Sequence, residues 1–193
     1  MDGQIDIAAP QAVPDIERLL GAIHERSPVH RSYIHGDQHW RAVAEVGLRL
    51  LPENRKADPM VVFLFSLFHD ALRENEDKDP GHGRRGAELA HELHGRYFLL
   101  PPERLGLLIE ACAGHTDVRF SDDPTIGVCF DADRLNLWRV GVRPDARWLS
   151  TAAARSPHRI AEASRLEGQY ESWQDLFRRY ANAAGAAAKS TRT

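Results

Sequence analysis

Apolar residues recur three or four positions apart along most of the chain, which is the spacing of amphipathic α-helices. The first such stripe covers residues 16–23 and follows Pro14 and Asp15, which are residue types common at helix starts. No stretch alternates polar and apolar residues as a half-buried strand does. The same spacing predicts further helices at about 37–51, 59–72, 82–98, 101–114, 124–139 and 158–183.

Residues 60–68 (MVVFLFSLF) are the most apolar part of the chain, and they are apolar on all sides rather than along one face. Such a short run fits either a buried strand or a buried helix. Because the segments on both sides are predicted to be helical, we favour a buried helix. In the helix that follows, Gly86, Ala87 and Ala90 are small enough to let a partner helix approach closely.

The length of 193 residues suits one domain with a substantial hydrophobic core. The helical segments are separated by polar or proline-containing loops at about 74–81, 115–124 and 141–157. We therefore predict an all-α fold, a single-domain helical bundle over residues 1–184, with a flexible tail at 185–193.

The charge balance excludes some classes of partner. Lys and Arg total 25, Asp and Glu total 28, and the formal net charge is −3, whereas nucleic-acid binders are mostly basic. The apolar run at 60–68 is too short to span a bilayer, and the acidic N-terminus has no apolar run typical of a signal peptide. We expect a cytoplasmic protein that binds neither nucleic acid nor membranes.

The chain has 10 histidines but only 2 cysteines, so a disulfide framework or a thiolate zinc finger is excluded. Cys112 and Cys129 lie in apolar stretches, and we expect both to be buried. A metal site would instead be built from imidazole and carboxylate, which suit Fe, Mn, Zn, Ni or Co. The candidate ligands are His39, His69, Asp70, His82, His115 and Asp133.

Their positions favour a shared site. His69 and Asp70 directly follow the most apolar helix, and a buried charge there needs a partner such as a metal ion. His39 lies four residues before Val43, so it faces the same core. Asp133 lies on the inward stripe of its helix, although Asp131 competes with it for the role of ligand. Each residue alone is weak evidence, but together they place a ligand on each of five helices.

The order and the neighbours of these residues resemble the HD-domain superfamily of metal-dependent phosphohydrolases. The resemblance covers about residues 35–140. It rests on four motifs: His39–Ala44 (HWRAVA), which resembles H-x-x-x-V-A; Phe68-His69-Asp70; His82–Ala87 (HGRRGA), which resembles H-x-x-x-G-A; and Ala132–Leu135 (ADRL), which resembles A-D-x-L.

The resemblance implies an all-α bundle of the HD-domain type that holds one or two divalent transition-metal ions between its helices. It implies that His39, His69, Asp70 and Asp133 hold one ion, and that His82 and His115 match the extra ligands of two-metal members. Asp70 would then bridge the two ions and orient the nucleophilic water. The implied reaction is hydrolysis of a phosphate ester in a nucleotide or another small phosphorylated metabolite, with a metal-activated water as the nucleophile.

Three further residues are candidates for binding the substrate. Arg73 lies three residues after Asp70, at the mouth of the expected site, and is our first choice for binding phosphate oxygens. His35 lies four residues before His39, and Arg134 directly follows Asp133. The simpler interpretation of all three is a surface cation or a contact at a helix end.

The sequence also departs from the superfamily's best-defined branches, so the substrate stays unassigned. Arg73-Glu74 stands where alarmone hydrolases have Glu-Asp, and the G-Y-P signature of cyclic-dinucleotide hydrolases is absent. Two alternatives remain: a di-iron oxygenase of the same bundle type that acts on a small molecule, and a non-catalytic metal-binding sensor. Family frequencies favour the hydrolase.

The other polar candidates have simpler interpretations. Asp77 and Asp79 fall in the loop before His82, where they could order metal-bound waters; we favour a solvated loop. The segment 138–148 (WRVGVRPDARW) fits a pocket lid, a dimer contact or a packed corner. We assign five histidines to structure or solvent: His24, His30, His91, His94 and His158.

Overall fold

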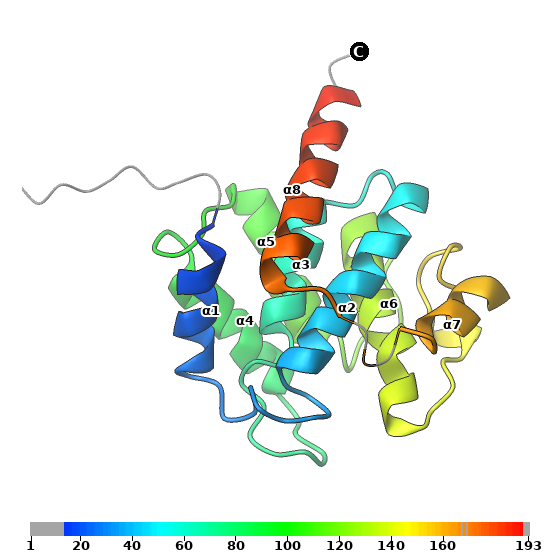
Figure 1. Ribbon diagram of the computed structural model, residues 1–193, viewed down its shortest axis with the longest axis horizontal. Helices are drawn as coiled ribbons and strands as arrows, with labels where there is room; N and C mark the ends of the chain where they lie inside the picture. Colours follow the sequence, from blue (N-terminus) through cyan, green and yellow to red (C-terminus); the bar gives the residue numbers. More distant parts are fainter. Residues whose placement is uncertain (1–13, 167, 169, 191–193) are drawn as a thin grey trace, which may run out of the picture.

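The computed structural model describes residues 14–166, 168 and 170–190. These residues form eight α-helices and, within the described ranges, no β-strand, which confirms the all-α class (Figure 1). The helices are α1 (Ile16–His24), α2 (Asp37–Leu50), α3 (Pro59–Phe68), α4 (His82–Leu93), α5 (Pro102–Gly114), α6 (Pro124–Arg134), α7 (Pro157–Ala163) and α8 (Trp173–Ser190). Three short 3-10 helices are added: η1 (Leu51–Glu53), η2 (Leu135–Val140) and η3 (Ala146–Trp148).

Helix α3 lies at the centre of the bundle. It begins where the Asp58 carboxylate accepts hydrogen bonds from the backbone N–H groups of Met60 and Val61, which satisfies donors that a helix start leaves free. Every residue from Val61 to Phe68 is buried, and the helix packs against α2, α5, α6 and α8. The apolar run is therefore a buried helix, as predicted.

Two helices of the predicted bundle end earlier than the periodicity indicates, and the helix predicted over about 124–139 changes after Arg134 from α6 into the 3-10 helix η2. Helix α3 ends at Phe68 instead of continuing to 72, so that His69 and Asp70 lie in the turn that follows it. Helix α4 ends at Leu93 instead of 98, two residues before Gly95, whose φ of 78° leaves the helical region. Apolar residues that follow the two helix ends, such as Ala71 and Phe98, are buried in the core although they are not helical. They therefore extend the apolar spacing in the sequence beyond the helices.

The prediction of one helix over 158–183 is wrong. The chain forms two helices there, α7 and α8, which are separated by residues 164–172. Gly168 in this connection has a φ of 77°, and Ser172 accepts a hydrogen bond from the backbone N–H of Asp175 at the start of α8. Helix α8 then continues to Ser190, so residues 185–190 of the expected tail are helical. Residues 1–13 and 191–193 lie outside the described residues.

Close helix contacts at glycines bring α4 against its neighbours. A Cβ atom at Gly86 would overlap the carbonyl oxygen of Phe68 at the end of α3, and one at Gly83 would overlap the carbonyl oxygen of Cys112 in α5. The small residues of α4 therefore have the role that the sequence predicts. Cys112 and Cys129 are both buried, also as expected. Among the described residues, no helix combines the length and hydropathy needed to cross a membrane.

Candidate metal centre

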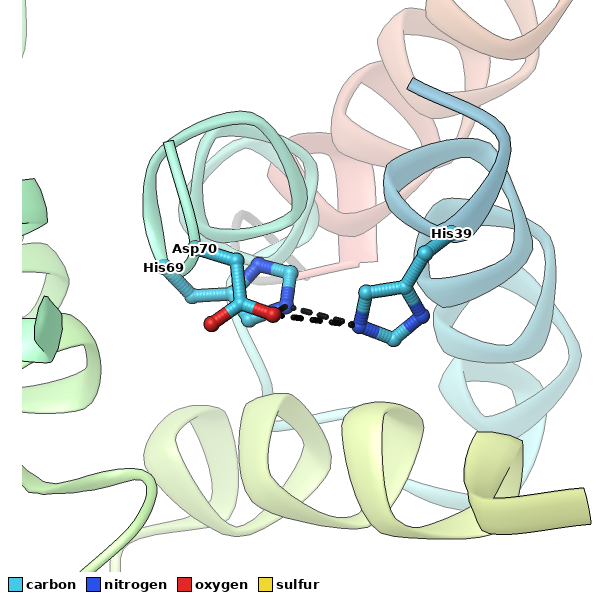
Figure 2. Close-up of side chains that lie close together, drawn as sticks. All are labelled: His39, His69 and Asp70. Carbon is cyan, nitrogen blue, oxygen red and sulfur yellow. Dashed lines mark hydrogen bonds and ion pairs between the residues drawn. The ribbon is translucent and has the colours of Figure 1, made fainter. Parts of the chain in front are cut away.

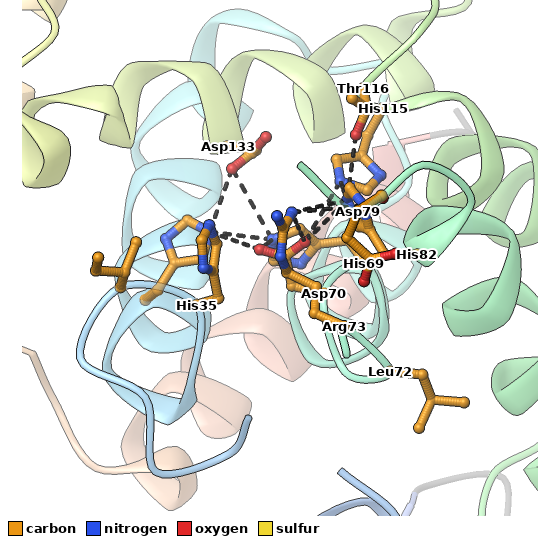
Figure 3. Close-up of polar contacts among 12 residues, drawn as sticks. His35, His69, Asp70, Leu72, Arg73, Asp79, His82, His115, Thr116 and Asp133 are labelled. Atoms are coloured by element: carbon orange, nitrogen blue, oxygen red, sulfur yellow. Dashed lines mark hydrogen bonds and ion pairs between the residues drawn. The ribbon is translucent and has the colours of Figure 1, made fainter. Parts of the chain in front are cut away.

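The six candidate ligands come together where the ends of five helices meet. Figure 3 labels five of them, and Figure 2 labels the sixth, His39, beside His69 and Asp70. His39 lies in the first turn of α2, and His82 is the first residue of α4. His115 follows the last residue of α5, Asp133 lies in the last turn of α6, and the pair His69-Asp70 follows α3. These residues are up to 94 positions apart in the chain, so the fold brings together the ligands that were predicted from the sequence.

One group of ligands lies between α2, α3 and α6. The Nε2 atoms of His39 and His69 are 3.1 Å apart, and each lies 3.7 Å from Oδ2 of Asp70 (Figure 2). Asp133 closes this group from α6: its Oδ1 lies 3.2 Å from Nε2 of His39 and 3.9 Å from Nε2 of His69. His39, His69 and Asp70 are buried, and the Asp133 side chain is 17% exposed.

A second group lies between α3, α4 and α5. Oδ1 of Asp70 is 3.1 Å from Nε2 of His82 and 3.7 Å from Nε2 of His115. The two Nε2 atoms are 3.0 Å apart. The carboxylate of Asp70 thus directs one oxygen to each group, which makes it the residue shared by both.

Hydrogen bonds to the backbone orient three of the four imidazoles. Nδ1 of His69 bonds to the carbonyl of Phe65 at 3.2 Å, Nδ1 of His82 to that of Asp79 at 2.6 Å, and Nδ1 of His115 to that of Cys112 at 2.8 Å. A carbonyl oxygen only accepts, so Nδ1 carries the proton in each ring. In the neutral ring, the lone pair is then on Nε2, which is the atom that faces the other ligands.

The donor set fits a divalent transition metal. Lone pairs of two imidazoles that face each other at about 3 Å repel unless a cation or a proton lies between them. Oδ1 of Asp70 is buried and has no hydrogen-bond partner among the described residues; Nη1 of Arg73 lies 3.7 Å away, so this oxygen keeps lone pairs for a further cation. Imidazole nitrogen and carboxylate oxygen are ligands for Zn, Fe, Mn, Ni and Co. These buried groups can hold metal, as expected, and their chemistry leaves the choice of ion open.

The pKa shifts of His39, His69 and Asp70 agree with this arrangement. Burial lowers the pKa of His69 to about 3, despite the opposing charges of Asp70 and Asp133, and burial together with Arg139 lowers the pKa of His39. Burial alone would raise the pKa of Asp70, but its contacts with His69, His115 and His82 hold it well below its usual value. In the first group, neutral imidazoles beside an ionised carboxylate are thus the protonation states that metal ligation requires. In the second group, burial would lower the pKa of His115, but its hydrogen bond to Asp70 and the charges of Asp133 and Asp70 raise it.

The loop before His82 is more ordered than the solvated loop that the sequence suggests. The Asp79 side chain is buried, and its carboxylate accepts from the backbone N–H of Glu74 at 2.8 Å and from Nη2 of Arg85 at 2.6 Å. These bonds place the carbonyl of Asp79 where it accepts the hydrogen bond from Nδ1 of His82. Asp79 therefore supports the second group through His82, a role that its position in a polar segment does not reveal.

Arg73 lies beside the second group, where its position in the sequence predicts it. Its Nη1 lies 3.7 Å from Oδ1 of Asp70 and 3.3 Å from Nε2 of His82. The guanidinium is buried, and its Nη2 donates to the carbonyl of Asp77 at 2.7 Å. The fold thus places a fixed positive charge next to Asp70.

His35 and Arg134 have structural partners instead. Nδ1 of His35 is 2.6 Å from Oε2 of Glu76, which links the segment before α2 to the loop after Asp70. The guanidinium of Arg134 was expected to bind the substrate, but its donors are used by four backbone carbonyls. These belong to His115 (3.0 Å), Trp148 (2.7 Å), Arg119 and Val118. Arg134 acts as a brace for the backbone at His115.

Asp131 is not part of the centre. Its carboxylate accepts hydrogen bonds from the backbone N–H groups of Ser150 (2.6 Å) and Thr151 (2.7 Å), and burial raises its pKa. This settles the competition with Asp133, which alone of the two contacts His39 and His69. The remaining histidines are not in the ligand groups; His94, for example, holds the turn at the end of α4 through Leu100.

Arg139, which lies in η2, was not among the residues predicted from the sequence. Together with His39 it lines a cavity of about 290 Å³, whose other lining residues are Tyr33, Gln38, Arg41, Gly168 and Tyr170. The segment 138–148 is rich in Arg and aromatic residues, but its place beside the metal ligands depends on the turn from α6 into η2. The sequence indicates only that this segment is rich in arginine, and it does not show which of its arginines lies beside the candidate metal centre.

Comparison of the chain with protein-family models, with curated proteins and with solved structures finds no match. The likeness to an HD-type site therefore rests on the motif residues and on the geometry of the His and Asp cluster.

Proposed function

We propose that this protein is a metal-dependent phosphohydrolase of the HD type that cleaves the phosphate ester of a small molecule. The observation that carries the proposal is the position of Asp70, whose two carboxylate oxygens face two separate groups of buried ligands. A carboxylate shared in this way suits a pair of cations, and pairs of cations are typical of phosphate-ester hydrolysis.

The residues divide into two sets around Asp70. His39, His69 and Asp133 would hold one ion with Oδ2 of Asp70, and His82 and His115 would hold the other with Oδ1. Divalent cations bound there would supply Lewis-acid chemistry, because they neutralise phosphoryl oxygens and lower the pKa of water. The ligands themselves are oriented beforehand by the backbone carbonyls that hold three of the imidazoles.

The chain contributes a further positive charge to the phosphate. Arg73 is held beside Asp70 by the carbonyl of Asp77 and keeps its guanidinium charge next to the second group. In this position it would donate to phosphoryl oxygens as negative charge develops. In the reaction, water adds to phosphorus, the bond between phosphorus and the ester oxygen breaks, and the leaving oxygen takes up a proton to give an alcohol and inorganic phosphate.

The primary experiment combines metal analysis with a substrate screen. Protein purified without chelator is expected to contain one to two transition-metal ions per chain. It is then assayed for phosphate release from nucleotides and sugar phosphates in the presence of Mn, Co, Ni, Zn or Mg. A folded protein that binds none of these metals contradicts the proposed site.

The matched variants are Asp70→Asn and Asp122→Asn, the second at an exposed carboxylate outside the cluster. We expect Asp70→Asn to lower activity at least about 100-fold, since changes to mere supporting groups of metal ligands already cost 10–100-fold. Circular dichroism is expected to show retained helix content, and Asp122→Asn is expected to behave as the wild type. Full activity of Asp70→Asn would remove Asp70 from the reaction.

The screen also separates the alternatives. Oxygen consumption by the iron-loaded protein, with no phosphate released from any ester, would replace the hydrolase by the di-iron oxygenase. Tight metal binding without either reaction would favour a metal-binding sensor.

A further inference from the structure

A cavity of about 290 Å³ lies directly beside the metal centre, and His39 belongs to both. Nε2 of His39 faces His69 and Asp133, while its ring forms part of the cavity lining. Nδ1 of His39 is buried and, unlike that of the other three ligand histidines, has no hydrogen-bond partner among the described residues. The cavity therefore adjoins the place where the bond of a bound ester would break.

Arg139 brings to this cavity a positive charge that has no carboxylate partner within the described part of the chain. Its Nε donates to the carbonyl of Ile34 at 2.8 Å and its Nη1 to that of Asn136 at 3.1 Å, and both of these acceptors are neutral. Among the residues that the structure describes, no carboxylate lies within ion-pair distance of the Arg139 guanidinium. A guanidinium has five N–H donors, so the two anchoring bonds leave others for a ligand.

Arg41, the other arginine of the cavity, is different. Its guanidinium is paired with the carboxylate of Asp37 through Nε at 2.8 Å and through Nη2. Its charge is thus largely cancelled within the protein. The guanidinium of Arg139, in contrast, donates its described hydrogen bonds to neutral backbone carbonyls, so its charge is not cancelled in this way. Arg139 is therefore the residue of this cavity that is set to attract an anion.

The remaining lining supplies flat surfaces. Tyr33 and Tyr170 both border the cavity, and 68% of the Tyr33 surface is exposed. Tyrosine rings provide contact area for planar groups with little loss of side-chain freedom. A cavity of this size and lining suits a small ring more than an extended chain.

We propose that the cavity binds the part of the substrate that leaves as the alcohol, and that this part is a planar group carrying an anionic substituent anchored by Arg139. The designation as leaving group rests on the proposed phosphohydrolase function. The binding of a planar anion stands on the cavity alone. Carboxylate and phosphate substituents present the same oxygen chemistry to a guanidinium.

The test measures binding without turnover. Isothermal titration calorimetry on the full chain, as purified, is carried out with benzoate, phenylphosphonate and the neutral analogue benzyl alcohol. We expect benzoate to bind more tightly than benzyl alcohol. Arg139→Gln is expected to weaken benzoate about tenfold or more, because hydrogen bonds to charged groups contribute about 1.5–3 kcal/mol, and to leave benzyl alcohol unchanged. The phenylphosphonate arm shows whether a phosphate-type anion is preferred over a carboxylate.

Two further variants show whether the effect belongs to the charge of Arg139 alone. Arg84→Gln removes an exposed arginine that pairs with Glu88, remote from the cavity lining, and we expect no change in the affinity for benzoate. Arg139→Lys keeps the charge and is expected to retain part of the affinity. If benzoate instead binds to a metal ion, the wild type and Arg139→Gln will bind it with equal affinity. This result would overturn the proposal.

Arg139→Gln also loses the hydrogen bond to the Ile34 carbonyl and could for that reason fail to fold. A second variant, at an exposed position of the cavity lining, therefore keeps the proposal testable. Tyr33→Ala is expected to weaken both benzoate and benzyl alcohol, since it removes a ring from the lining. No effect on either ligand would overturn the role of the cavity. If no phosphate ester is hydrolysed but the binding of benzoate depends on Arg139, the proposed function fails while the anion site remains.

Discussion

The imidazoles of His69, His82 and His115 each direct Nε2 into the metal centre because Nδ1 is held by a carbonyl only three or four residues earlier. In a helix or a turn, the backbone carbonyl three or four residues earlier lies close to each residue whatever the rest of the fold. The orientation of each ring is therefore a local property of its own segment. His39 lacks this support, and its position depends on the neighbouring ligands instead.

Asp37 shows how a charge near the centre affects stability. It accepts from the Trp173 indole at 2.7 Å and from Arg41, and His24 lies 3.4 Å away. Burial would raise its pKa, but these three contacts lower it to about 2. Since the unfolded value is about 3.9, ionised Asp37 stabilises the fold above about pH 4, and this contribution disappears as the pH falls toward 2.

We expect Asp37→Asn to lower the free energy of unfolding by about 2 kcal/mol at pH 7. The difference from the wild type should shrink as the pH falls from 4 toward 2, because Asp37 becomes neutral first in the unfolded chain and then, near pH 2, in the folded protein. Urea unfolding at pH 7, 5, 4 and 3 measures this difference, with Asp122→Asn as the exposed control. A difference that is the same at every pH would attribute the effect to lost packing instead of charge.

At the scale of elements, helix ends carry the ligands. His39 and His82 lie in first turns, His115 and the pair His69-Asp70 directly follow helices, and Asp133 lies in a last turn. Ends of five helices converge only if the helices approach closely. The glycines of α4 allow this against α3 and α5.

Gly86 is the critical contact between α4 and α3. We expect Gly86→Ala to lower the free energy of unfolding by about 1–3 kcal/mol, because the new Cβ overlaps the Phe68 carbonyl oxygen and forces the helices apart. Gly106 in α5 is the matched control, since nothing lies within 4 Å of a Cβ built there. Gly106→Ala should raise stability by about 0.5–1 kcal/mol through better helix propensity.

Thermal and urea unfolding of both variants, together with metal content, test this expectation. Loss of metal in Gly86→Ala would also be consistent with the overlap, because Phe68 immediately precedes His69. If both glycine variants had the same stability, close packing at Gly86 would not limit the approach of the helices.

At the scale of the whole molecule, metal binding and folding are expected to be coupled. The ligands come from segments spread over residues 39–133, so the complete donor set exists only in the folded chain. A ligand that binds only the folded state stabilises it by about 2.7 kcal/mol at 100 times its dissociation constant.

We therefore expect transition-metal ions to raise the melting temperature by about 5–10 °C, given about 2–4 °C per kcal/mol for a domain of this size. Addition of a chelator should reverse the shift. Differential scanning calorimetry of the wild type and of Asp70→Asn measures it, and the variant should lose most of the increase. An equal increase in both proteins would indicate binding outside the cluster.

The periodicity of the chain determined the class of fold and most helix starts. Pro59, Pro102 and Pro124 lie in the first turns of their helices, close to the predicted positions, since such signals act within a few residues. The cluster of ligands was also predictable, because polar residues at the ends of apolar helices must find partners in the core. The split between α7 and α8 was missed, as the apolar spacing continues across 164–172.

What only the tertiary structure decided concerns contacts between distant segments. The pairing of Arg134 with four carbonyls and the place of Arg139 beside His39 join different elements, and the burial of Asp79 depends on its ion pair with Arg85 of α4. An arginine side chain is long enough to reach several sets of partners from one backbone position. Which partners it contacts depends on where the carbonyls and carboxylates of other elements lie. Sequence alone could therefore nominate the histidines and aspartates of the centre, because the helix ends that carry them are fixed locally, but not the arginine that charges the cavity next to it.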